Sequence, residues 1–272
     1  MGMKRFAGDR HALGARLLRP LALAAALLAA LPVAAGAPEK GKEKDSCVAC
    51  HRDPKFLVQN KKLYDYFRDW QLSIHQQNDV SCSDCHGGNP EIAGKQGAHG
   101  EEVGEEGKDN AVNFKNIPDT CGQCHDEFLE AYLGSNHFEH LAKAKQEKQG
   151  PNCVTCHGSM NTSVLDVTTV KAACARCHNE ETGNKPEIPD EARVILNKFL
   201  SIDRFHRYLS VRLKPEEKAA FLVDTDARIH ALAVSWHSFD LKKIERETQA
   251  LVDLMKRKRD AVGNRSGKGA AP

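Results

Sequence analysis

The sequence predicts a mainly α-helical protein with much irregular loop and no significant sheet. The first observation is a five-residue pattern, Cys-x-x-Cys-His, that occurs five times between residues 47 and 178. The second is the low aliphatic content of residues 46–187, where glycine, lysine, glutamate and asparagine are abundant. The third is a change at about residue 188, beyond which apolar residues recur at spacings of three and four, the period of an amphipathic helix.

The five copies of the motif use all ten cysteines of the chain. Each copy is an attachment signature for a c-type haem, because its two thiols can form thioethers with the haem vinyl groups and its histidine can bind the iron. Structural zinc, disulfides and thioredoxin-like sites give no reason for a histidine after every pair. We therefore predict five covalently bound haem c groups, held by Cys47, Cys50 and His51, by Cys82, Cys85 and His86, by Cys121, Cys124 and His125, by Cys153, Cys156 and His157, and by Cys174, Cys177 and His178.

The beginning of the chain has the three parts of a secretory signal. Five basic residues against one acid precede the apolar run 21–31, and small residues follow it. We predict a signal peptide at residues 1–35, cleaved near Ala35, and a polar leader at 36–45. An uncleaved anchor is the alternative, but Pro20 and Pro32 enclose fewer than the roughly 20 apolar residues that a membrane span needs. The mature protein is expected in the periplasm, with peripheral membrane association as an option.

The charge balance gives no indication of nucleic-acid binding. The chain has 39 basic and 37 acidic residues, and residues 1–35 account for five of the basic residues and one acid. The mature chain therefore carries 34 basic against 36 acidic residues. The basic cluster 256–259 is expected to be a solvated helix end.

The haem-binding region is predicted at residues 46–187, and two of its motifs share their surroundings. Ser73-Ile74-His75 precedes the second motif, Ser135-Asn136-His137 precedes the fourth, and glycine follows both motifs. This repetition indicates a duplicated unit in which a helix with a ligand leads into an attachment site. Residues 94–110 are expected to form an open polar loop. Because so polar a region buries little apolar surface, we expect the haems to supply its core.

A C-terminal helical region is predicted at residues 188–262, where it supplies distal ligands. The first helix is expected to end at about 211, and Pro215 suits the first turn of a second helix to about 222. Asp224-Thr225-Asp226 is expected to cap a long helix from about 226 to 262. Residues 263–272 are expected to form a disordered tail.

Histidine is the expected second axial ligand of the irons. The mature chain has only two methionines, Met160 and Met255, whereas seven histidines remain after the five proximal ones and His11 of the signal. We predict as distal ligands His75, His99, His137, His230 and His237. His230 and His237 are seven residues apart, so on one helix they would face the same way about 10.5 Å apart. His140 and His206 are the reserves.

These motifs resemble those of exported multihaem c-type cytochromes, the group with tetrahaem electron carriers and the haem-packing core of nitrite and hydroxylamine oxidoreductases. The likeness is carried by the run from Trp70 through His75 to Pro90 and by Ser135-Asn136-His137 leading to the fourth motif. It implies a core of closely packed haems in parallel and perpendicular pairs. Cytochrome c nitrite reductases usually carry their active haem on Cys-x-x-Cys-Lys, whereas all five motifs here end in histidine.

The sequence therefore favours a periplasmic electron-transfer protein over an enzyme. We expect a pentahaem cytochrome that carries electrons in an anaerobic respiratory chain through mostly bis-histidine haems. Its expected partners are redox proteins, namely a quinol-oxidising complex, a terminal reductase or other cytochromes. One alternative is a reductase in which one open iron acts on a small nitrogen or sulfur compound. Another is an electron-relay subunit of a membrane quinol-oxidising complex.

Overall fold

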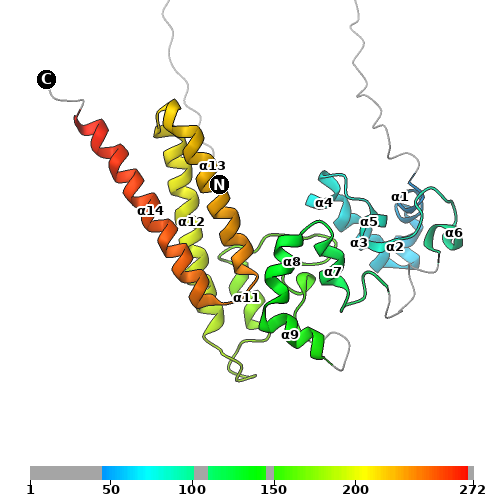
Figure 1. Ribbon diagram of the computed structural model, residues 1–272. Coiled ribbons are helices and arrows are strands. Elements are labelled where there is room, and N and C mark those ends of the chain that lie inside the picture. Colours follow the sequence, from blue (N-terminus) through cyan, green and yellow to red (C-terminus); the bar gives the residue numbers. More distant parts are fainter. Residues whose placement is uncertain (1–44, 101–109, 145–149, 269–272) are drawn as a thin grey trace, which may run out of the picture. The chain divides into compact units, whose positions relative to one another are not determined.

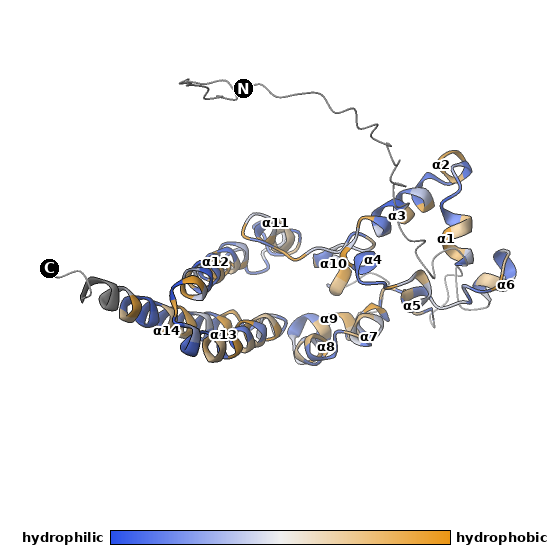
Figure 2. Cartoon of the chain, turned by 90° about the horizontal axis from the view of Figure 1, so that it is seen from above, coloured by the Kyte–Doolittle hydropathy of each residue, from blue (hydrophilic) through white to orange (hydrophobic). Residues whose placement is uncertain are grey.

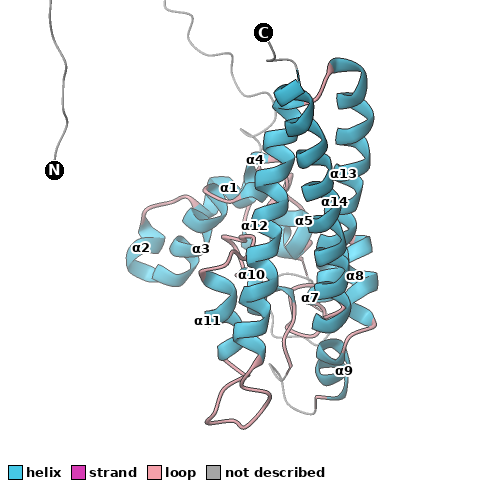
Figure 3. Ribbon diagram, turned by 90° about the vertical axis from the view of Figure 1, so that its left-hand side faces the viewer, coloured by secondary structure: helices cyan, strands magenta, loops and turns pink. Residues whose placement is uncertain are grey.

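The computed structural model describes residues 45–100, 110–144 and 150–268. Within these segments helices are the regular structure and no strand is present (Figure 3). This confirms the predicted fold class. No helix of the described segments has both the length and the hydrophobicity to cross a bilayer. The predicted signal peptide and residues 36–44 of the leader lie outside the described residues.

Short helices joined by loops and turns make up the described part of the haem-binding region (Figure 1). They are α1 (Ser46–His51), α2 (Lys55–Gln59), α3 (Lys61–Gln71), α4 (Ile74–Gln77), α5 (Cys82–His86), α6 (Lys95–His99), α7 (Ile117–Gly122), α8 (Asp126–Leu133), α9 (Asn136–Lys143), α10 (Cys153–His157) and α11 (Thr169–Ala175). The polar loop expected at 94–110 is thus helical at its start, and His99 is the last residue of α6.

The second and fourth motifs have the same local structure. α5 and α10 each begin at the first cysteine of the motif, and a capping box formed with Ser81 or Asn152 satisfies the N-terminal backbone groups. Gly87 and Gly158 follow the helices with φ of 72° and 80° and extended ψ. That conformation is essentially restricted to glycine, which explains the glycine after these two motifs.

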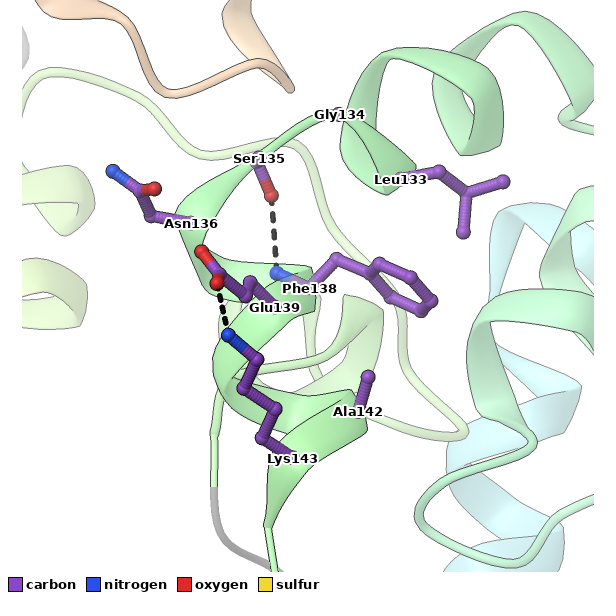
Figure 4. Close-up of a pocket in the computed structure, with 8 residues that line it drawn as sticks. All are labelled: Leu133, Gly134, Ser135, Asn136, Phe138, Glu139, Ala142 and Lys143. Atoms are coloured by element: carbon purple, nitrogen blue, oxygen red, sulfur yellow. Dashed lines mark hydrogen bonds and ion pairs between the residues drawn. The ribbon is translucent and has the colours of Figure 1, made fainter.

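The serines of the two Ser-x-His patterns are helix N-caps. The Ser73 hydroxyl accepts a hydrogen bond from the Gln76 amide at 3.2 Å, and the Ser135 hydroxyl accepts one from the Phe138 amide at 3.1 Å (Figure 4). Both serines are buried. The next residue but one is the histidine, so this cap fixes His75 and His137 in the first turn of α4 and α9.

Replacing Ser135 with alanine is expected to destabilise the protein by about 1 kcal/mol, because the cap of α9 is lost in a buried place. Thermal unfolding of the haem-loaded protein measures this effect. Ser159→Ala is the control, since Ser159 is exposed and lies outside the helices. Equal stability of the two variants would contradict the capping role.

Three long helices follow: α12 (Ile188–Arg212), α13 (Pro215–Trp236) and α14 (Leu241–Lys268). They lie side by side (Figures 1 and 3), and each contacts the other two. Hydrophobic and hydrophilic residues alternate around them (Figure 2), as amphipathic helices require. Their shared core consists of Ile202, Leu209, Leu213, Leu232, Leu251, Val252, Met255 and Val262.

The break between the last two helices differs from the prediction. Thr225 does not cap a helix but is buried inside α13, where its hydroxyl donates to the Phe221 carbonyl at 2.8 Å. The helix breaks instead after Trp236. Asp240 is the N-cap that the sequence prediction missed. Its carboxylate accepts a hydrogen bond from the Lys243 amide at 3.0 Å in the first turn of α14. At its other end α14 continues to Lys268, past the predicted end at 262.

Replacing Leu209 with alanine is expected to destabilise the three-helix core by about 2 to 5 kcal/mol, because Leu209 is fully buried and the change leaves a cavity. Chemical unfolding followed by circular dichroism measures it. Val211→Ala is the matched control on the same helix, because Val211 is 80% exposed. If the Val211 variant lost as much stability, α12 would pack through a different face.

The haem-binding region has few buried apolar side chains. In the described segments they are Phe67, Ala98, Pro118, Tyr132, Leu141 and Val170, and they come from six different helices. The continuous core of eight buried apolar residues belongs to α12–α14 and the Leu213 turn. This distribution fits the expectation that apolar macrocycles complete the core of residues 46–187.

Candidate haem-binding sites

The thiols of the first three motifs lie in sequence order in space. Burial, followed by the charges of Asp45 and Cys47, raises the pKa of Cys82 to about 12. Burial, followed by the charge of Cys121, raises the pKa of Cys85. Because Coulomb interactions weaken with distance, the thiols of the second motif lie near those of the first and near those of the third.

The same order continues to the fifth motif. A hydrogen bond with the thiol of Cys153 raises the pKa of Cys121. Burial, followed by the charge of Cys174, raises the pKa of Cys156 to about 11. All ten cysteines lie in the described segments, and none of them forms a disulfide. The five motifs therefore form a continuous series of neighbouring attachment sites.

Four of the five proximal histidines face a second histidine from elsewhere in the chain. The ring centres of these pairs are 6.0 to 6.3 Å apart. The pairs are His51 with His99 at 6.2 Å, His75 with His125 at 6.3 Å, His137 with His178 at 6.0 Å, and His157 with His237 at 6.0 Å.

This separation fits two axial ligands of one iron. An imidazole nitrogen binds a transition metal at about 2.0 Å and its ring centre lies roughly 1.1 Å behind it, so imidazoles on opposite haem faces have centres about 6 Å apart. A haem needs only two protein ligands, because the porphyrin supplies the other four. Structural zinc needs four, and the described segments hold no group of three or more His, Cys, Asp or Glu side chains arranged for a metal ion.

Hydrogen bonds fix the orientation of several of these imidazoles. Nδ1 lies within hydrogen-bond distance of a backbone carbonyl in three of them: His157 with Ser163 at 2.8 Å, His178 with Asn184 at 3.0 Å, and His237 with Ala233 at 2.9 Å. Nδ1 of His75 lies 3.2 Å from the Thr162 hydroxyl. A proton held on Nδ1 leaves Nε2 as the nitrogen for the iron.

Burial keeps the candidate ligands in their metal-binding form. It lowers the pKa of His137 to about 4, with the charges of His178, His140 and Lys185 adding to the effect. It also lowers the pKa of His51, His86 and His237. These imidazoles are therefore uncharged at neutral pH, and the neutral ring is the one that coordinates a metal.

The two Ser-x-His histidines do not face the motif that follows them. His75 precedes the second motif but faces His125 of the third, and His137 precedes the fourth motif but faces His178 of the fifth. The histidine of each capped helix thus faces the second of the two motifs that follow it in the sequence. The two copies of the Ser-x-His pattern thus share one arrangement, in which the motif that directly follows the histidine is passed over.

The C-terminal helices bring His237 to the fourth motif. His237 is the C-cap residue that directly follows α13, and α13 packs against α8. Between them lies the Phe128 ring of α8, whose edge-on contacts join His125 at 6.0 Å, His230 at 5.7 Å and His237 at 5.0 Å. Phe128 therefore holds His125, the candidate proximal ligand of the third motif, near His237, the candidate distal ligand of the fourth.

His230, which is also a predicted distal ligand, lies outside the histidine pairs. Its Nε2 lies 2.7 Å from a carboxylate oxygen of Glu127, and its side chain is 56% exposed. In the described segments its ring faces no proximal histidine. The helix ends at Trp236, and His237 rather than His230 turns toward an attachment site.

The two reserve histidines are also outside the pairs. His140 is exposed on α9, one turn from His137. His206 of α12 stacks on Phe221 with ring centres 6.0 Å apart, and its Nε2 lies 3.1 Å from a carboxylate oxygen of Asp226. Among the proximal histidines, His86 has no second imidazole across from it in the described segments.

One surface pocket lies close to a candidate ligand. It has a volume of about 360 Å³ and is formed by the turn from α8 to α9. Figure 4 shows its lining, which contains no cysteine or histidine. The pocket is therefore not one of the haem sites.

Comparison with known proteins gives two similarities. The family described as Cytochrome c7 and related cytochrome c matches residues 107–179, which include the third, fourth and fifth motifs. The chain is also similar to the multiheme cytochrome MtrA of Shewanella baltica (strain OS185), with 26% identity over 144 residues. This stretch is 53% of the chain but 34% of the relative, so the chain matches about a third of that protein's length. No solved structure matches. Both similarities are to cytochromes, and with the attachment motifs and the histidine pairs they support the conclusion that this chain is a multihaem c-type cytochrome.

Proposed function

We propose that the chain carries five covalently bound haem c groups and transfers electrons between periplasmic redox proteins in an anaerobic respiratory chain. The observation that carries this proposal is the set of four histidine pairs with ring centres 6.0 to 6.3 Å apart. An iron with both axial positions filled by the protein exchanges electrons without binding a substrate. The haem supplies this one-electron chemistry when bound.

The chain's own residues hold and orient the five groups. Ten thiols in five neighbouring motifs anchor them in a series, and the order of the thiols supports electron transfer from one end of the series to the other. Neutral imidazoles would hold four of the five irons from both sides. Histidine in place of methionine keeps the reduction potentials low, which suits an anaerobic chain.

The proposed partners and location rest on the sequence. The signal features of residues 1–35 support export to the periplasm, with cleavage near Ala35. The partners would be a quinol-oxidising complex, a terminal reductase or other cytochromes, and peripheral membrane association is compatible with the first of these. The balanced charge of the mature chain offers nothing for nucleic acid.

Mass spectrometry and visible spectroscopy test the proposal. The full chain is produced in a bacterium with a haem-attachment system, and the mature protein is purified from the periplasm. We expect the mass of residues 36–272 plus five haem groups, a Soret band, and complete reduction by a low-potential donor. A mass equal to that of the bare polypeptide would overturn the proposal.

A further inference from the structure

We infer that the haem attached at Cys82, Cys85 and His86 has an open distal side and binds a small exogenous ligand, such as CO on reduced iron or cyanide on oxidised iron. This inference rests on the proposed five-haem function and adds a ligand-binding site to it. The observation behind it is that His86 alone among the proximal histidines faces no second imidazole in the described segments. An iron with one protein ligand keeps a position for an external one.

The supply of histidines supports this assignment. Apart from His11, every histidine of the chain lies in the described segments. Four of the seven non-proximal histidines are used in pairs. The others have different partners: His230 binds Glu127, His206 packs on Phe221, and His140 is exposed beside His137. None of these three makes a ring contact with His86.

The duplication in the chain shows why the second motif is left without a partner. In both copies the Ser-x-His histidine passes over the next motif and faces the one after it. The passed-over motifs are the second and the fourth, which also share the capping box and the glycine that follows. The fourth motif obtains His237 from the end of α13. α13 is not part of the duplicated pattern. No second helix of this kind therefore supplies a distal histidine to the second motif in the described segments.

The segment after the second motif places its histidine, His99, at the first motif instead. The Asn89 amide donates to the Ala98 carbonyl at 2.8 Å, which folds residues 89–98 back on themselves. This fold places His99, at the end of α6, opposite His51 of the first motif. The nearest histidine that follows His86 in the sequence is therefore committed to another iron.

His86 is nevertheless placed as a haem ligand. It is partly buried at the end of the capped helix α5. It lies near the His51–His99 pair, since both of these histidines contribute to its electrostatic environment. An open iron at this place would adjoin the first haem of the series and could receive electrons from it.

The ligand class follows from the chemistry of such an iron. Reduced haem with a single histidine binds neutral diatomic molecules, and oxidised haem binds small anions. CO and cyanide are the respective probes. Irons with two histidines offer no vacant position to either probe, so the stoichiometry of binding counts the open sites.

Titration of the purified five-haem protein tests the inference. We expect one CO per chain after reduction, and a high-spin signal from one of five haems in the electron paramagnetic resonance spectrum of the oxidised protein. Cys82→Ser with Cys85→Ser removes this haem, so we expect four haems and no bound CO. His99→Ala is the positive control, because it opens the first iron and raises the count to two.

Each outcome separates the two proposals. Five haems with uniformly low-spin spectra and no bound CO would overturn the open site and leave the electron-transfer proposal standing. In that case CO titration of the variants His140→Ala, His206→Ala and His230→Ala would identify the second ligand of this iron, because the variant that lacks it would bind CO. Fewer than five haems would instead contradict the proposed function. A structure of the unsubstituted protein with cyanide locates the ligand even if the double cysteine variant fails to accumulate, and cyanide on any other iron would disprove the assignment.

Discussion

Replacing His237 with alanine is expected to convert one low-spin haem into a high-spin haem that binds CO, while replacing His230 leaves the haems unchanged. The two residues are seven positions apart in the sequence, but only His237 faces a proximal histidine, at 6.0 Å from His157. His230 is bonded to Glu127. The loss of an axial imidazole changes the spin state of the iron, whereas the loss of the Glu127 bond removes an exposed ion pair, worth about 0 to 1 kcal/mol.

Electron paramagnetic resonance and CO titration of the two variants measure the difference. The His237 variant should bind one CO more per chain than the unsubstituted protein, and the His230 variant should bind the same amount. His230 is therefore the matched control on α13. A new high-spin haem in the His230 variant, with the His237 variant unchanged, would show that the helix presents its ligands in the opposite way.

A chain without covalent haem is expected to lose the helices of residues 46–175 and to keep the three long C-terminal helices. α1–α11 contain roughly half of the helical residues, so circular dichroism should fall by about half. The reason is the distribution of the core. The buried apolar cluster belongs to α12, α13, α14 and the turn at Leu213, and the short helices have too few buried apolar contacts to offset the entropy of ordering.

Production of the chain with serine at all ten cysteines measures this effect. Limited proteolysis should yield a resistant fragment that begins near residue 188, and the haem-loaded protein under the same conditions is the control. Native helical content in the haem-free chain would contradict the conclusion that the macrocycles complete the core of residues 46–187. Complete unfolding would show that α12–α14 depend on contacts with α8 and α11.

Much of the local structure could be predicted from the sequence. Pro215 does begin a helix, and Ser73 and Ser135 do stand before helices that carry histidines. Such features depend on interactions within about one helical turn. The position of the break in the C-terminal helices was missed because Thr225 can either cap a helix or bond back to its own helix, and packing decided for the second.

The sequence by itself determined the motifs, their number, the helical class and the supply of histidines, because covalent attachment and capping depend on residues that are adjacent in the chain. Only the tertiary structure decided which histidine faces which motif. His75 faces the third motif rather than the second, and His237 rather than His230 reaches the fourth. The pair of His157 with His237 joins residues 80 positions apart, and the helix that leads to His237, α13, packs against α8. The spacing of residues along the chain does not reveal such packing. This is why the sequence did not show that His86 is the one proximal histidine without a second imidazole across from it in the described segments.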